Sequence, residues 1–345
     1  MTLALAPACP PDDATTPHGA LLLARGYARL AALLEPLHLD VRWPVEAASG
    51  ELTGTPAPLA RTEYGAPSIP LRSRPTLEQL ALRPELIEEF LAAEAARIAA
   101  TAAPCAPAGA PAGAPSPQAG TPCATTDPTG PTAPTAPTAP TAPPRHVLAA
   151  RALHGSLWSL SLLVSGPWYL EDRVPLLAPR AVRYDLAADR YEVTPGGFVC
   201  LPGDPAAGLP GVRTVPDAEA LRGALRDAFA DLVRPLLTAV APAFRRGPRA
   251  LWGMAGDDLL SGIWTLGRTL GDEERAVRRA TEVLPRAIAP YPAAANFRRL
   301  TGRTGATHLT RTRTGCCLYY AVRPGEACGT CPRTADAERL RRLGD

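Results

Sequence analysis

The chain has 345 residues, of which 46% are hydrophobic and 20% are charged, and its formal net charge is +3. Such a composition is typical of a globular protein, and the length allows one large domain or two modest ones with a sizeable core. The net charge is too small to indicate a polyanion that contacts the whole chain, so we expect no nucleic-acid partner.

The N-terminal 16 residues lack the basic region and the continuous apolar stretch of a secretory signal, which predicts a cytoplasmic protein. The longest apolar run, residues 147–164, is interrupted by Arg151 and His154 and fits a buried element better than an integral membrane span. Structural disulfides are disfavoured in the cytoplasm. Clusters among the eight cysteines therefore indicate metal binding.

The first 100 residues predict helices. The segment from His18 to Leu37 places four apolar residues at the spacing of one helical face: Leu23, Tyr27, Leu30 and Leu34. Thr76 and Gln79 have the spacing of a capping box, and Pro84 is suited to begin the next helix. That helix would present three apolar residues to the core: Leu86, Phe90 and Ile98.

Residues 101–145 consist almost entirely of Ala, Pro, Thr and Gly and contain Pro-Thr-Ala repeats. This segment has too little large apolar surface to offset its ordering entropy, which predicts a disordered linker. Cys105 and Cys123 lie inside it, where no metal site could be preorganised. We expect four regions, namely an N-terminal helical or mixed region (1–100), this linker (101–145), an α+β region (146–295) and a cysteine-rich C-terminal segment (296–345).

After the linker, Val182, Tyr184 and Leu186 alternate with polar residues, as do Tyr191 and Val193, which predicts a β-hairpin. Three helices should follow, the first capped by Asp217, the second from Pro248 to Leu270, and a short third one that begins with Asp272, Glu273 and Glu274. Glycines within the second helix predict close packing: Gly253, Gly256, Gly262 and Gly267. The predicted class is α+β, helix-dominated, with a small antiparallel sheet.

The most informative segment contains Cys316, Cys317, Cys328 and Cys331. Four thiolates can hold a [2Fe–2S] cluster, a [4Fe–4S] cluster or a structural zinc ion. The Cys-x-x-Cys pair is a common chelating turn for each of them. The adjacent pair fits poorly on a single tetrahedral zinc, because neighbouring side chains diverge and zinc sites separate paired ligands by two to four residues. Iron–sulfur is therefore favoured, with zinc and free thiols as alternatives.

The order Cys-Cys, ten residues, Cys, two residues, Cys, with Leu318-Tyr319-Tyr320 after the first pair, resembles the C-terminal segment of FhuF-type ferric-siderophore reductases. The resemblance covers about residues 311–332, and Trp252-Gly253 is similar to the middle of that family. It implies a [2Fe–2S] cluster on Cys316, Cys317, Cys328 and Cys331, and one-electron reduction of ferric hydroxamate siderophores. The sequence departs from the family pattern in two places. Met254 follows Trp252-Gly253 where the family pattern would have a polar residue, and the linker of residues 101–145 is not a feature of the family.

The resemblance makes 296–345 the cluster segment and 146–295 the siderophore-reductase-like region, without naming catalytic residues. The sequence contains no readable nucleotide-binding motif, so electrons would come from a partner protein or a reduced flavin. Competing functions are a four-cysteine zinc or iron–sulfur module for binding or redox sensing, and a siderophore-binding protein with a structural cluster. Arginines in the segment could stabilise the reduced cluster, dock an acidic donor or form a solvated surface: Arg298, Arg299, Arg303, Arg311, Arg313, Arg323 and Arg333.

Other polar residues favour structural interpretations. His154 lies alone in an apolar segment, which favours a hydrogen-bonded core histidine over a metal ligand. Asp257 and Asp258 point about 100° apart on a helix, which favours a solvated helix edge over paired acid–base work. Cys200 should be a buried apolar residue. Two tyrosines should either pack over the cluster or fill the core: Tyr319 and Tyr320.

Overall fold

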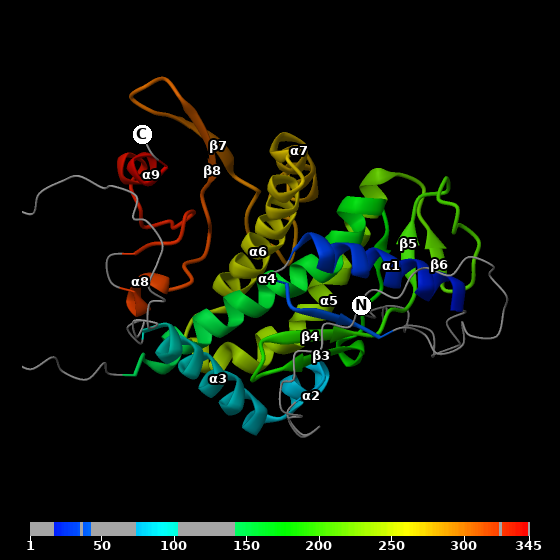
Figure 1. The fold of residues 1–345 in the computed structure, drawn as a ribbon, viewed down its shortest axis with the longest axis horizontal. Helices are drawn as coiled ribbons and strands as arrows, with labels where there is room; N and C mark the ends of the chain where they lie inside the picture. The colour runs from blue at the N-terminus through cyan, green and yellow to red at the C-terminus, as the bar shows by residue number, and fades with distance from the viewer. Residues whose placement is uncertain (1–16, 35–36, 43–73, 103–141, 324–325, 344–345) are drawn as a thin grey trace, which may run out of the picture.

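The longest apolar stretch of the sequence forms α4 (Arg145–Glu171), a helix at the centre of the fold (Figure 1). Among the described residues, α4 is the one helix long and apolar enough to cross a membrane, yet 67% of its apolar 18-residue stretch is buried inside the protein. Such burial is typical of a core helix, as the interruptions by Arg151 and His154 predicted. The computed structural model describes residues 17–34, 37–42, 74–102, 142–323 and 326–343.

Two long helices pack along α4: α5 (Ala218–Phe244) and α6 (Pro248–Thr269). The carboxylate of Asp217 caps α5 by accepting a 2.8 Å hydrogen bond from the backbone N–H of Ala220. Asp272 caps α7 (Glu273–Val283) in the same way through Arg275 N–H. These caps satisfy backbone donors that the first helical turn leaves free, and both predicted starts are confirmed.

Glycines let α6 approach its neighbours closely. A Cβ atom added at Gly262 would collide with the hydroxyl of Ser161 in α4, and one added at Gly267 would collide with Ala276 in α7. The predicted close packing of the glycine-rich helix is thereby confirmed. The loss of helix propensity at these positions is offset by tight helix–helix contact.

The N-terminal helices contribute to the same core as α4, α5 and α6. They are α1 (Pro17–Leu33), α2 (Leu77–Leu82) and α3 (Pro84–Ala102). Thr76 and Gln79 form the predicted capping box, with hydrogen bonds of 3.1 and 2.9 Å between each side chain and the other residue's backbone N–H. Of the predicted linker (101–145), residues 103–141, with Cys105 and Cys123, lie outside the described residues, whereas Thr101 and Ala102 end α3 and Arg145 begins α4. The four-region division stays a prediction.

The predicted hairpin is present as β3 (Val182–Asp185) and β4 (Arg190–Val193), which pair antiparallel. The α+β, helix-dominated class is confirmed, but the sheet is not a single antiparallel one. The first sheet adds β1 (Leu39–Val41) parallel to β4. A second sheet contains β2 (Val174–Pro175), β5 (Phe198–Cys200) and β6 (Val212–Thr214), with β5 and β6 parallel. Strands of two or three residues are too short to show an alternating pattern.

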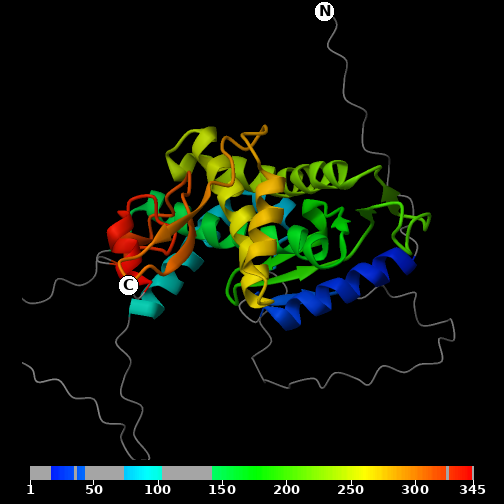
Figure 2. The same cartoon turned by 90° about the horizontal axis from the view of Figure 1, so that it is seen from above.

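The C-terminal segment lies alongside α6, away from β5 and β6 (Figures 1 and 2). It begins with an antiparallel hairpin, β7 (Phe297–Thr301) and β8 (Thr307–Arg311). The cysteine segment follows, with the short helix α8 (Tyr319–Val322), and α9 (Asp336–Arg342) ends it. One 3-10 turn, Pro179–Ala181, precedes β3.

Candidate metal centre

The cysteine segment follows β8 and consists of two parts that carry two thiols each. Cys316 and Cys317 come first, and the backbone bends directly after them, where Leu318 adopts a left-handed conformation with φ 59°. Cys328 and Cys331 flank a turn in which Cys331 N–H donates a 3.0 Å hydrogen bond to the Cys328 carbonyl. Both parts therefore have the bent backbone that a shared metal centre requires of an adjacent pair and of a Cys-x-x-Cys turn.

Cys317 and Cys328 lie in contact, with 3.9 Å between their sulfur atoms. A tetrahedral metal with metal–sulfur bonds of about 2.3 Å places two thiolates about 3.8 Å apart, so this pair fits one metal centre. Across the described residues, no three potential ligands converge as a complete metal site. The structure thus brings one thiol of each predicted pair into contact, and among the described residues it does not assemble all four thiols into a closed ligand set.

The contact between Cys317 and Cys328 favours one thiolate in the pair. The Cys328 thiol, nearby His154 and Arg151, and the Tyr319 N–H lower the pKa of Cys317 well below the usual thiol value, against the effect of its burial. The same contact raises the pKa of Cys328, because a second negative charge beside the first is disfavoured. Thiolates are the form that binds metals, and binding a metal at the second sulfur would release its proton.

A buried ion pair joins the segment to α6. Asp257 accepts a 2.6 Å hydrogen bond from Arg311 Nη2 and a 2.7 Å bond from the backbone N–H of Gly315, next to the first cysteine. The Arg311 and Asp257 side chains are only 1% and 2% exposed. Asp257 is therefore an anchor of the chain between β8 and Cys316.

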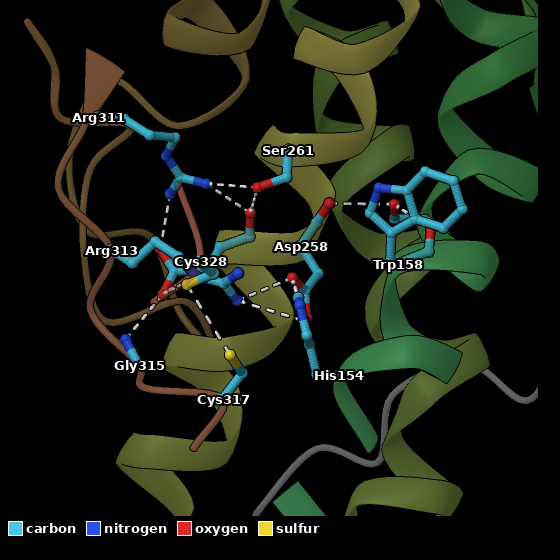
Figure 3. A network of polar contacts seen from close by, with 11 residues as sticks. His154, Trp158, Asp258, Ser261, Arg311, Arg313, Gly315, Cys317 and Cys328 are labelled. Carbon is cyan, nitrogen blue, oxygen red and sulfur yellow. Dashed lines mark hydrogen bonds and ion pairs between the residues drawn. The ribbon is translucent and has the colours of Figure 1, made fainter. Parts of the chain in front are cut away.

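Asp258 forms a second buried bridge, to a different partner. Its carboxylate accepts a 2.8 Å hydrogen bond from Arg313 Nη2 and lies 2.9 Å from His154 Nδ1 on α4 (Figure 3). Burial opposes ionisation, but the charges of His154 and Arg313 outweigh it and lower the pKa of Asp258. The expected hydrogen-bonded role of His154 is confirmed.

The expectation of a solvated helix edge at Asp257 and Asp258 was wrong, since both residues are buried. β8 and the cysteine segment cover this side of α6, and two arginines more than fifty positions along the chain neutralise the carboxylates. The two adjacent side chains do point in different directions, as expected on a helix, and each accepts a hydrogen bond from a different arginine: Asp257 from Arg311 and Asp258 from Arg313. A local pattern cannot reveal partners supplied from so far away in the sequence.

Arg339 of α9 is a residue that the sequence did not single out. Its buried guanidinium donates 2.9 Å hydrogen bonds to the carbonyls of Gly329 and Cys331, the turn that carries the second thiol pair. It also donates a 3.2 Å bond to the Thr310 hydroxyl in β8. In sequence Arg339 resembles the exposed Arg341, so no local signal separates the two.

The arginine-rich stretch is therefore not one solvated surface. Arg311 and Arg313 are buried, whereas Arg298 and Arg299 form surface ion pairs with acidic residues of α9 and α7. Arg333 lies over the ring of Tyr320 at 4.6 Å, and Arg151 lies over Tyr319 at 5.0 Å. Both tyrosines are partly exposed, so neither simply fills the core.

Cys200, the remaining cysteine in the described residues, lies at the end of β5, and its side chain is buried in the hydrophobic core. This position confirms the expectation of an apolar structural residue. It also provides a thiol outside the C-terminal segment as a control.

The contact between the Cys317 and Cys328 thiols and the bent backbone beside them fit a metal–thiolate protein with its centre in the C-terminal segment. Residues 313–333 match the FhuF 2Fe-2S C-terminal domain, a match that includes all four cysteines of the segment. This match confirms the family resemblance for this short part of the chain and indicates a [2Fe–2S] cluster. No curated protein sequence matches the chain.

Proposed function

We propose that this protein is a cytoplasmic ferric-siderophore reductase, whose [2Fe–2S] cluster is bound by Cys316, Cys317, Cys328 and Cys331. The observation that carries the proposal is the match of the FhuF 2Fe-2S C-terminal domain to the segment with these thiols. The contact between Cys317 and Cys328 supports their sharing one iron. The substrate would be a ferric siderophore of the hydroxamate class.

The chemistry of iron explains why reduction would release the metal from the siderophore. Hydroxamates bind Fe(III) through hard oxygen donors, and the softer Fe(II) is bound far more weakly by the same donors. When bound, a [2Fe–2S] cluster supplies electrons one at a time, which is the stoichiometry that Fe(III) requires. Transfer of one electron therefore converts a tightly bound cargo into a weakly bound one.

The residues around the thiols have supporting roles in this proposal. Arg339 places buried positive charge beside the Cys328–Cys331 turn, which favours additional negative charge there. Asp257 fixes the backbone at Gly315 and keeps the first thiol pair in position. The electron donor would be a partner protein or a reduced flavin, docked at the exposed arginines if it is acidic.

Two other functions would use the same thiols. A four-cysteine zinc or iron–sulfur module could bind a partner or sense redox state without reducing siderophores, and a siderophore-binding protein could hold a purely structural cluster. The zinc form of the first is disfavoured by the 2Fe-2S domain match, whereas its iron–sulfur form differs from a reductase only in lacking siderophore reduction. The second differs from a reductase in one property, the ability of the cluster to give its electron to the ferric complex.

A single-turnover experiment tests the proposal. Chemically reduced, cluster-loaded protein is mixed without oxygen with a ferric trihydroxamate and a ferrous chelator. Re-oxidation of the visible spectrum with release of about one Fe(II) per chain is expected, since a [2Fe–2S] cluster normally cycles by one electron. Protein that stays reduced for hours beside several ferric siderophores would refute reductase function and favour the sensor or structural alternatives.

A further inference from the structure

A cavity of about 500 Å³ lies beside the cysteine segment, between α4, α6 and β8. Its volume is within the usual range for small-molecule sites, about 300–1,000 Å³. Gly329 and Thr330, the two residues between Cys328 and Cys331, form part of its lining. A ligand in this cavity would therefore contact the turn that carries the second thiol pair, with no further layer of protein between them.

Two indole side chains form apolar parts of the lining, Trp158 from α4 and Trp264 from α6. Trp264 is held in place: its Nε1–H donates a 2.7 Å hydrogen bond to Glu273, and its ring packs edge-on against Phe297 at 5.6 Å. Half-buried tryptophans that border a cavity provide rigid contact area at low conformational-entropy cost.

The cavity also contains a buried polar atom without a partner among the described residues. His308 of β8 lines the cavity, and the Nε2 atom of its ring accepts or donates no hydrogen bond within this part of the chain. Buried polar atoms in native proteins are almost always paired, so such an atom indicates a ligand or an ordered water. His154 and Arg313 also line the cavity, and Asp258 engages His154 Nδ1 and Arg313 Nη2.

The positive charges of the cavity lining are nearly balanced by negative charges. Arg268 lies 3.8 Å from Glu273, and Arg313 is paired with the buried Asp258. The lining residues that the structure describes therefore provide no cluster of unpaired cations to receive a polyanion. A ferric trihydroxamate core is electrically neutral, because three monoanionic hydroxamates balance Fe(III). A tris-catecholate complex carries three negative charges and would lose hydration here without gaining countercharge.

We infer that this cavity is the binding site for the ferric complex, and that its neutral lining with two indoles selects uncharged trihydroxamates over trianionic tris-catecholates. The inference rests on the proposed reductase function for the identity of the ligand. The position of the cavity is suited to direct electron transfer, because the Cys328–Cys331 turn is part of its wall.

The test uses Ga(III) complexes, which have the charge and shape of the ferric ones and cannot be reduced. Calorimetric titration of the full-length, cluster-loaded protein should detect binding of the Ga(III) complex of a neutral cyclic trihydroxamate. The trianionic Ga(III) tris-catecholate should bind at least about tenfold more weakly, a difference of about 1.4 kcal/mol. Absence of trihydroxamate binding, or equal affinity for both complexes, would overturn the assignment.

Two variants locate the site. Trp264→Leu removes an indole wall, and Thr265→Trp fills the cavity from α6, so each should weaken trihydroxamate binding by about tenfold or more. Trp252→Leu, on the same helix but outside the cavity lining, is the matched control and should stay within about twofold. The visible spectrum of the cluster verifies that each variant is folded and loaded. Unchanged affinity in either folded cavity variant would place the ligand elsewhere.

The failure of this assignment and the failure of the reductase proposal give different results. If the cavity variants lose Ga(III) complex binding while the reduced wild type fails to reduce the ferric complex, the binding site stands and reductase activity does not. If the wild type and both variants reduce the ferric complex at the same rate and half-saturating concentration, the activity stands and the cavity assignment is wrong.

Discussion

Arg311 and Asp257, 54 positions apart in the sequence, form a buried ion pair that joins the end of β8 to the middle of α6. Arg311 Nη1 also donates 2.6 Å and 3.0 Å hydrogen bonds to the Asp257 carbonyl and the Ser261 hydroxyl. Because Asp257 additionally accepts from Gly315 N–H, one carboxylate fixes both ends of the stretch that leads into the cysteines.

Replacement of Asp257 by Asn should strongly destabilise the fold. The substitution leaves the guanidinium of Arg311 buried without a countercharge, and breaking a buried pair in this way costs about 3–5 kcal/mol. Chemical denaturation monitored by circular dichroism should record this loss in the free energy of unfolding. The cluster should also be lost faster to a chelator, because the Gly315 anchor is weakened.

The control is the surface pair between Arg299 and Glu274, which also joins the C-terminal segment to a helix. Its side chains are 51% and 56% exposed, so Glu274→Gln should cost no more than about 1 kcal/mol. Equal losses for Asp257→Asn and Glu274→Gln would show that the buried pair has no special role in anchoring the segment.

The four clustered thiols should each be needed for the cluster, whereas Cys200 should not. Protein purified without oxygen is expected to be brown and to contain about two irons and two acid-labile sulfides per chain. Cys→Ser at any one of the four positions should reduce both contents and alter the visible and EPR spectra: Cys316, Cys317, Cys328 and Cys331. Cys200→Ala should retain them, and colourless wild-type protein with stoichiometric zinc would contradict the cluster assignment.

Asp258 should contribute stability that depends on pH. Its folded-state pKa is lowered, so its contribution is fully present above the ordinary carboxyl pKa of 3.8 and is lost as the pH falls through the folded value. Asp258→Asn should therefore be much less stable than wild type at pH 7, and the difference should narrow below about pH 4. Denaturation at several pH values measures this, and a difference that stays constant to about pH 3 would contradict it.

Much of the fold could be predicted, because its elements carry strong local signals. The capping box at Thr76, the cap at Asp217 and the hairpin around Val182 depend on residues only a few positions apart, and each is present. The parallel pairings of β1 and β6 could not be predicted. Each strand has three residues, and its partner is chosen by tertiary packing rather than by its own pattern.

The candidate site likewise combines features set by local sequence with features set by tertiary packing. The four cysteines could be found because their spacing is local and chemically specific, and the family match falls on them. The anchors Asp257 and Arg339 could not, because their importance depends on burial and on partners from other elements. The local sequence around an aspartate is the same whether its carboxylate is solvated by water or paired with a distant arginine.

Arg339 should set the reduction potential of the cluster. Its buried guanidinium binds the carbonyls of Gly329 and Cys331, so its positive charge lies beside the second thiol pair. Reduction adds a negative charge to the cluster, which this cation stabilises. Arg339→Met should therefore lower the potential by on the order of 60 mV, a tenfold change for a one-electron couple.

Two further variants separate the effect of charge from that of structure. Arg339→Lys keeps the charge while losing hydrogen bonds, so its potential should stay closer to that of wild type. Arg341→Met removes an arginine that is 70% exposed and paired with Glu338, and it should leave the potential unchanged because water screens its charge. EPR-monitored redox titration of the cluster-loaded proteins measures all three. If Arg339→Met and Arg341→Met have equal potentials, the charge of Arg339 does not act on the cluster and its role is confined to holding the turn.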